Sequence, residues 1–226
     1  MKNWHIAAKN KCFVASYSGG KDSTLALYKA ISQGGSPVAL LSMLREEDGY
    51  VGSHGVSPQI IAAQAQAMDI PLLTFTTTWR DYGPNLLAGL AQARRLGAEA
   101  LVTGDLDLPE EGCWYEQIAQ KAQLDFCAPL WRYGHRQAVE EFLQAGFTTM
   151  LTAVNEKMGM TQEDLGRILD WKYMAELEAR GIDPCGEAGE FHSIVLDGPI
   201  FKYPLKVYKT GTHSCGGNSC LQLKIK

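Results

Sequence analysis

A glycine turn between a strand and a helix, close to the start of the chain, limits what this sequence can fold into. The apolar run 13–17 predicts a strand, and 24–33 predicts a helix because its apolar residues recur at a spacing of four. Between them lies the hexapeptide SGGKDS. Its two glycines let the backbone approach a ligand closely, and the free N–H groups and dipole of a helix start attract anions. The sequence therefore predicts a phosphate-binding turn.

Side chains around this turn strengthen the prediction. Lys21 adds a positive charge, and three hydroxyl groups add hydrogen-bond donors. The turn is not a Walker A loop, which needs Gly-x4-Gly-Lys followed by Ser or Thr, because Asp22 follows the lysine here. An ordinary Ser/Gly turn without a ligand is the alternative. The predicted nucleotide-binding residues of the turn are Ser18, Gly19, Gly20, Lys21, Asp22, Ser23 and Thr24.

Strand and helix signals alternate along the first 130 residues. Apolar runs at 38–44, 72–76 and 100–103 predict buried strands, and helices are expected to begin near residues 58, 84 and 114. This alternation predicts an α/β fold with a doubly wound parallel sheet, whose ligands bind beyond the carboxyl ends of the strands. The glycine turn, the segment after Leu44 and the pair Gly104-Asp105 all fall on that edge.

The pattern changes after Pro129, where shorter helices alternate with strands expected at 147–154, 190–196, 205–209 and 221–225. Thr161 and Asp164 resemble a capping box that opens a helical region ending near residue 180. We therefore expect a nucleotide-binding domain at 1–130 and a smaller mixed α+β domain at 131–226 that binds the substrate.

A second dense group of polar residues lies at 185–193, CGEAGEFHS. Its carboxylates, Glu187 and Glu190, could bind a substrate ammonium or hold Mg2+ against phosphate, and His192 could move a proton. A solvated turn whose acids face water is the other interpretation. Composition alone leaves these alternatives open.

The two motifs together resemble a known family. SGGKDS is similar to the PP-loop of the ATP pyrophosphatases, and its pairing with Gly186-Glu187-x-Gly189-Glu190-Phe191 resembles the diphthine–ammonia ligase family. The segment 104–107 (GDLD), the pair Trp114 and Glu116, and 129–131 (PLW) match further motifs of that family. The resemblance covers about residues 12–200.

This resemblance implies a HUP-type fold and an ATP-dependent, AMP-forming ligase. Family members adenylate a carboxylate, the diphthine of elongation factor 2 in archaea and eukaryotes, release pyrophosphate, and let ammonia displace AMP. In a bacterial protein the acceptor would be a different carboxylate. The resemblance implies that the catalytic residues are Lys21, Asp22, Glu187, Glu190 and His192. Asp22 and Asp105 would position Mg2+. The rest of the ATP site would be formed by Ser42, Met43, His54, Gly104 and Asp105, and the backbone at 42–43 would contact the adenine ring.

The overall composition limits the binding partners and the cellular compartment that we expect for this protein. The net charge is −4 and no basic run exceeds two residues, which argues against a nucleic-acid-binding protein. No apolar stretch matches a membrane span, and the first residues lack a signal-peptide core, so we expect a cytoplasmic protein. The fold is compatible with a homodimer.

Near the end of the chain, Cys215 and Cys220 could join His213 and Cys185 in a metal site, form a redox pair, or be free thiols on a mobile tail.

Two rival functions share this fold prediction. A PP-loop tRNA-modifying enzyme would adenylate a base of the tRNA. It would require a basic surface or an additional RNA-binding domain to bind that tRNA. A non-catalytic ATP-binding sensor would keep the phosphate turn but not turnover. The presence of Lys21, Asp22, Glu187 and Glu190 argues against the sensor.

Overall fold

The protein divides into two compact units in a computed structural model, which describes residues 2–52 and 55–226. The first unit comprises residues up to 18, Asp22–Gly49 and Ile70–Tyr133, and the second comprises Gly19–Lys21, Tyr50–Asp69 and Gly134–Lys226. Residues 19–21 of the glycine turn thus belong to the second unit, and residues 18 and 22–24 belong to the first. The predicted domain boundary between residues 130 and 131 stays a prediction.

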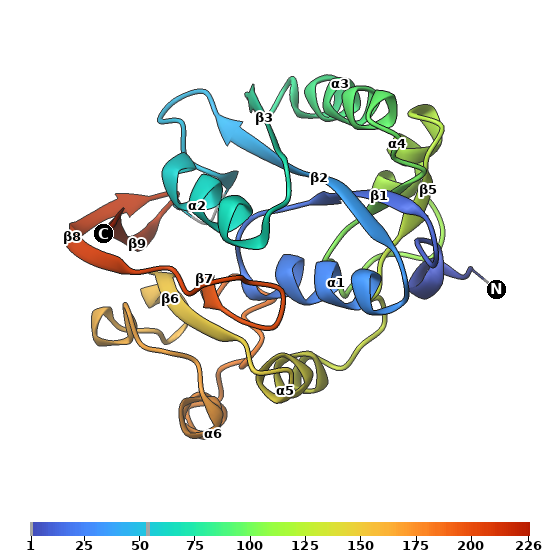
Figure 1. The fold of residues 1–226 in the computed structure, drawn as a ribbon. Coiled ribbons are helices and arrows are strands. Elements are labelled where there is room, and N and C mark those ends of the chain that lie inside the picture. Colours follow the sequence, from blue (N-terminus) through green and yellow to red (C-terminus); the bar gives the residue numbers. More distant parts are fainter. Residues whose placement is uncertain (1, 53–54) are drawn as a thin grey trace. The chain divides into compact units, whose positions relative to one another are not determined.

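The first unit is built on a five-stranded sheet of order β3-β2-β1-β4-β5. All four strand pairs are parallel, so the predicted doubly wound α/β fold is confirmed. The strands are β1 (Cys12–Ser16), β2 (Ser36–Arg45), β3 (Leu72–Thr77), β4 (Ala100–Val102) and β5 (Asp125–Cys127). Helix α1 (Lys21–Ser32) lies on one face of this sheet, and α3 (Tyr82–Arg95) and α4 (Trp114–Lys121) lie on the other (Figure 1).

Apolar runs explain the burial of the central strands. Leu40 and Leu41 of β2 point to opposite faces of the sheet, and both are fully buried because helices cover each face. At one end of the unit, the short helix η1 (Trp4–Ile6) places the Trp4 ring 4.5 Å from Trp131 and 5.1 Å from Phe126. The strands whose carboxyl ends carry the candidate site are thus packed in an apolar core.

The second unit contains an antiparallel sheet of order β7-β6-β9-β8. Its strands are β6 (Thr148–Val154), β7 (Phe191–Asp197), β8 (Val207–Cys215) and β9 (Asn218–Ile225). Its helices are α2 (Pro58–Met68), α5 (His135–Gln144) and α6 (Trp171–Ala179), with 3-10 turns η3 (Glu156–Met158) and η4 (Gln162–Asp164). The mixed α+β character predicted for the C-terminal part is confirmed. No described helix is long and apolar enough to cross a membrane.

The predicted helical region after Thr161 is wrong in extent. The capping box of Thr161 and Asp164 is present, but it opens only η4. Gly166, at φ +79°, then turns the chain away, and the next helix begins at Trp171 behind an Asp170 cap that accepts a hydrogen bond from Tyr173 N. Asp164 is instead buried, where Arg180 and the Tyr173 hydroxyl donate to it.

The prediction of a mobile tail with free thiols is also wrong. Strands β8 and β9 form a hairpin whose turn, Gly216-Gly217, has two positive φ values that favour glycine. The hairpin brings Cys215 and Cys220 to a Cα–Cα distance of 6.1 Å, within the range of a disulfide, and the two are bonded. A bonded pair offers no thiolate to a metal, so of the three alternatives the structure favours the redox pair.

Candidate active site

The glycine turn is held in the second unit by close packing. Gly19 has φ +81°, in the left-handed region that side chains disfavour. A Cβ built on Gly19 would lie 2.5 Å from both Gln64 Oε1 and Ile61 Cδ1. Both the backbone conformation and the space therefore require glycine at this position.

Gln64 is a residue of this site that the sequence analysis missed. It is fully buried on α2, and its Nε2 donates to Gly19 O at 3.0 Å and to Val195 O at 2.7 Å. Val195 N donates to the same Gly19 carbonyl at 2.9 Å. The turn is thus tied to β7 through backbone and side-chain hydrogen bonds. A polar residue on the apolar face of α2 was the only signal for it in the sequence.

Lys21 connects the two sequence motifs. Only 6% of Lys21 is exposed, and its Nζ lies 5.7 Å from the centre of the Phe191 ring. Phe191 is the last residue of the Gly-Glu-x-Gly-Glu-Phe motif and the first of β7. Residues separated by 170 positions therefore meet within one compact unit.

The second motif presents a buried carboxylate. Tight turns at Gly186 and Gly189, both with positive φ, lead to Glu190, which is 7% exposed and whose Oε2 has no hydrogen-bond partner within the described part of the chain. A buried charge without a partner is costly, which indicates that a ligand satisfies it. Glu187 accepts a hydrogen bond of 3.8 Å from Cys185 Sγ.

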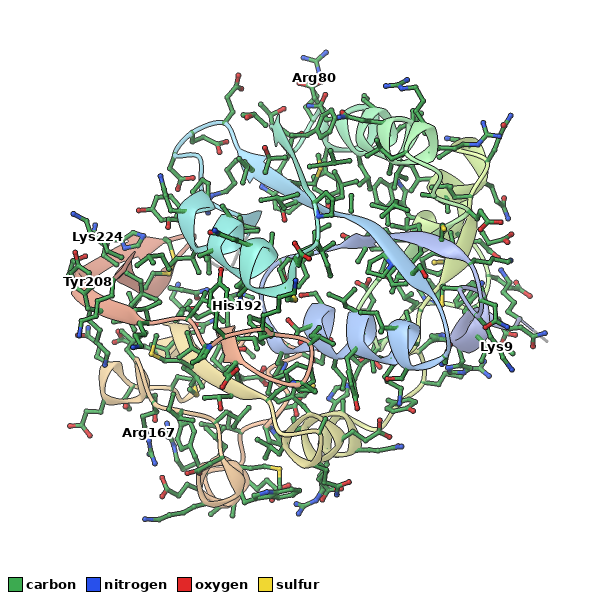
Figure 2. All side chains as sticks on the ribbon, in the orientation of Figure 1. Lys9, Arg80, Arg167, His192, Tyr208 and Lys224 are labelled. Carbon is green, nitrogen blue, oxygen red and sulfur yellow. A yellow bond between two sulfur atoms is a disulfide. The ribbon has the colours of Figure 1, made fainter. Side chains whose placement is uncertain are left out.

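His192 follows on β7, where Figure 2 labels it. Its position is fixed by the sheet, because it pairs with Ala153 and its carbonyl accepts a hydrogen bond from Thr152 Oγ1 at 3.4 Å. The side chain is only partly buried, so it is accessible for proton transfer.

The first unit carries the other half of the turn. Ser18 Oγ and Ser23 Oγ are 3.2 Å apart. A Cβ on Gly104 would lie 2.6–2.7 Å from the backbone of Asp22 and Ser23, so the chain after β4 packs directly on the start of α1. Burial raises the pKa of Asp105, and the negative charge of Asp22 raises it further. Of the three segments expected at the carboxyl edge, the start of α1 and the pair Gly104-Asp105 therefore lie together within the first unit.

Three predicted ATP-site side chains are engaged inside the fold. Thr24 Oγ1 donates to the Tyr17 hydroxyl at 3.3 Å, and Ser42 Oγ donates to the Tyr17 carbonyl at 2.6 Å. Met43 packs into the apolar core of the first unit. These side chains position the turn and β2, and the predicted adenine contact would use the backbone at 42–43. His54 lies outside the described residues.

The fold and the site define an α/β protein of the doubly wound class with a glycine turn at the carboxyl edge of its sheet. Residues 11–125 match the model of the diphthamide synthase N-terminal domain, and residues 135–224 match that of the diphthamide synthase C-terminal domain. The chain therefore belongs to the diphthamide synthase family, and the predicted family is confirmed.

Relatives of known name are similar along most of the chain. Proteins named diphthine–ammonia ligase are 28% identical in Schizosaccharomyces pombe, 27% in Danio rerio and 25% in Homo sapiens, over 82%, 86% and 82% of this chain. The match covers about a third (34%) of the fission-yeast protein, but 86% of the zebrafish protein and 78% of the human one. A crystal structure titled as a predicted tRNA methyltransferase subunit from Methanocaldococcus jannaschii is similar at TM-score 0.44 and 15% identity, covering 83% of this chain and 97% of that one, which is too slight to bear on function.

Proposed function

We propose that this protein is an ATP-dependent ligase that forms an amide from a carboxylate and ammonia. A carboxylate oxygen of the acceptor attacks the α-phosphorus of ATP, and the bond to the bridging oxygen breaks to release pyrophosphate. The nitrogen of ammonia then attacks the acyl carbon, AMP leaves with the bridging oxygen, and one proton passes to a base. By analogy with the relatives' name, the acceptor is diphthine or a carboxylate of similar chemistry.

The meeting of both motifs in one unit supports this proposal most strongly. The Gly19 carbonyl is bonded to Val195 N, and Lys21 lies over Phe191, so the phosphate turn is built together with the Glu190 segment. In a simple nucleotide-binding protein the turn would need no such partner. Here the lysine would stabilise the charge on departing pyrophosphate, and the second motif would stand beside the acyl group. Preorganised donors of this kind typically contribute about 10²–10³-fold to a rate.

The carboxylates of the first unit fit a divalent cation. Asp22 and Asp105 repel each other, and burial also disfavours the charge of Asp105. A hard cation between carboxylate oxygens would offset both costs, and Mg2+ is the usual partner of phosphate oxygens. When bound, Mg2+ would neutralise charge on the triphosphate. Asp22 and Asp105 would hold it at the start of α1.

Glu190 is the residue that we assign to ammonia. Its Oε2, which is buried and has no hydrogen-bond partner among the described residues, would bind ammonium, and the carboxylate would take up the proton that leaves when the nitrogen becomes a nucleophile. His192, two residues further along, would pass that proton to solvent. Glu187 would orient the acceptor through its carboxylate.

The test is an assay with ATP labelled at the α-phosphate. The full chain is incubated with Mg2+, ammonium and one acceptor at a time: a translation factor carrying diphthine, small carboxylic acids, or tRNA. We expect AMP and pyrophosphate with a carboxylate acceptor, and an amide product that depends on ammonium. Glu190→Gln should lose the amide, whereas the exposed Glu163→Gln in the same unit should behave as the wild type.

Three outcomes would contradict the proposal. Formation of ADP and phosphate would place the cleaved bond elsewhere. AMP formed only with tRNA would identify a tRNA-modifying enzyme. Tight ATP binding without turnover on any acceptor would identify a sensor.

A further inference from the structure

A histidine outside both sequence motifs is bonded to the start of the second one. His135 is the first residue of α5, and its Nδ1 lies 2.6 Å from Asp183 Oδ2. Because an ionised carboxylate only accepts hydrogen bonds, Nδ1 carries the proton and donates it. The two side chains are 36% and 19% exposed, so this hydrogen bond is partly shielded from water. Neither residue takes part in the chemical steps of the proposed reaction.

Asp183 uses both of its carboxylate oxygens. Oδ1 accepts a hydrogen bond of 2.9 Å from Cys185 N, a contact that aspartate often makes with the backbone two residues further on. The backbone carbonyl of Asp183 also accepts from Gly186 N at 3.0 Å, and Pro184 suits the second position of such a turn. Asp183 therefore fixes the start of the second motif, and His135 ties Asp183 to α5.

Hydrogen bonds continue from this turn to Glu190. Gly189 N donates to Gly186 O at 3.1 Å and closes a second turn directly after the first. Beyond it, Asn155 N donates to the Glu190 carbonyl at 2.8 Å. Glu190 thus follows two consecutive turns, which are anchored by His135 on one side and by Asn155 on the other.

Packing contributes little to the tip of this segment. Glu187 and Ala188 are exposed, and the two residues that flank them, Gly186 and Gly189, have no side chains. Where buried apolar contacts are few, hydrogen bonds have to specify the conformation. A displaced tip would displace Glu190 as well, and a misplacement of about 1 Å can lower a reaction rate about 10²-fold.

We propose that His135 and Asp183 are positioning residues for the carboxylate that binds ammonium. His135 orients Asp183, Asp183 holds the two turns, and the turns place Glu190. The effect on catalysis rests on the proposed ligase function, whereas the effect on the conformation of the segment does not.

Alkylation of Cys185 measures this conformational effect without any substrate. Cys185 is 1% exposed and is not disulfide-bonded, so iodoacetamide reaches its thiol only when the segment opens. His135→Leu removes the donor, and alkylation of Cys185, followed by mass spectrometry, should become about tenfold faster. Cys113 and Cys127, which are buried in the first unit, should react at unchanged rates.

His135→Asn is the matched variant. The amide nitrogen of asparagine is bonded to Cγ, as Nδ1 of histidine is, so it can donate to Asp183 in the same way. Alkylation of Cys185 in this variant should stay close to the wild-type rate. Leucine is the better helix former of the two, so faster alkylation in His135→Leu cannot come from a weakened α5.

The kinetics of amide formation test the effect on catalysis. The KM for ammonium should rise about tenfold in His135→Leu, while the KM for ATP should change less than about twofold because other hydrogen bonds hold the phosphate turn. His135→Asn should recover most of this loss. Arg136→Ala removes the neighbouring pair with Glu178 of α6, and it should change neither KM nor the alkylation of Cys185.

The outcomes separate this inference from the ligase proposal. Unchanged alkylation of Cys185 in His135→Leu would refute the positioning role. An equal rise of both KM values, or a loss that His135→Asn does not reduce, would show a general structural effect in its place. Faster alkylation in a protein that forms no AMP with any acceptor would refute the ligase proposal alone.

Discussion

Replacing Gly19 by alanine tests how the phosphate turn is built. The substitution places a side chain at φ +81°, which costs about 1–2 kcal/mol in the left-handed region. It also pushes a methyl group to 2.5 Å from Gln64 and Ile61, and overpacking of this kind costs about 1–3 kcal/mol. The sum is about 2–5 kcal/mol of unfolding free energy. For a chain of this length that corresponds to a fall in Tm of roughly 4–20 °C.

Gly181→Ala is the matched control. Gly181 has φ +72°, yet a Cβ there would meet nothing within 4 Å, so only the backbone cost of about 1–2 kcal/mol applies. Calorimetry should therefore show a larger loss for Gly19→Ala than for Gly181→Ala. ATP affinity should fall at least about tenfold for Gly19→Ala but not for Gly181→Ala. A displaced turn that loses about 1.4 kcal/mol of binding free energy gives a tenfold weaker affinity. Equal Tm losses with unchanged ATP binding in both variants would refute the packing argument.

Three further predictions concern other buried groups. Gln64→Leu removes two hydrogen bonds to buried carbonyls. The unfolding free energy measured by chemical denaturation should therefore fall by about 1–3 kcal/mol, and the affinity for ATP should also fall. Unchanged ATP affinity would show that Gln64 does not support the turn. Asp105→Asn removes a carboxylate whose negative charge is disfavoured by burial. Thermal scans of the nucleotide-free protein should therefore show a higher Tm, while AMP formation is lost. A lower Tm would contradict this expectation. Burial alone would raise the pKa of Asp164, but hydrogen bonds led by Arg180 hold it well below its usual 3.8. Because the folded pKa is the lower one, this stabilisation is present above pH 3.8 and is lost as the pH falls below it. Asp164→Asn should lower the unfolding free energy by about 2 kcal/mol at pH 7, because it weakens hydrogen bonds to a charged group. It should also reduce the loss of stability on acidification, and an unchanged loss would contradict a stabilising role of this carboxylate.

Local signals predicted much of the parallel sheet and the place of the candidate site. Helix α2 begins at Pro58 behind Ser57, as the Ser-Pro pair predicts, because proline suits the first turn of a helix. Consecutive apolar residues marked β2, since a strand covered on both faces needs no polar alternation. The carboxyl-edge rule then placed Gly104 near the start of α1, where it packs.

What the sequence analysis missed depends on partners far along the chain. Gln64 bonds to residues 45 and 131 positions away, so nothing in its own helix indicates the role. The disulfide of Cys215 and Cys220 follows from the hairpin register, and the loose spacing of the cysteines did not indicate that hairpin.

The location of the triphosphate tests the central claim most directly. A crystal structure of the protein with Mg2+ and an ATP analogue carrying a methylene group between the α- and β-phosphorus would resolve it. We predict that the β- and γ-phosphates bind the backbone N–H groups of residues 19–23, with Lys21 Nζ at a phosphate oxygen. A triphosphate bound away from these residues, with the turn in its present conformation and unliganded, would contradict the account.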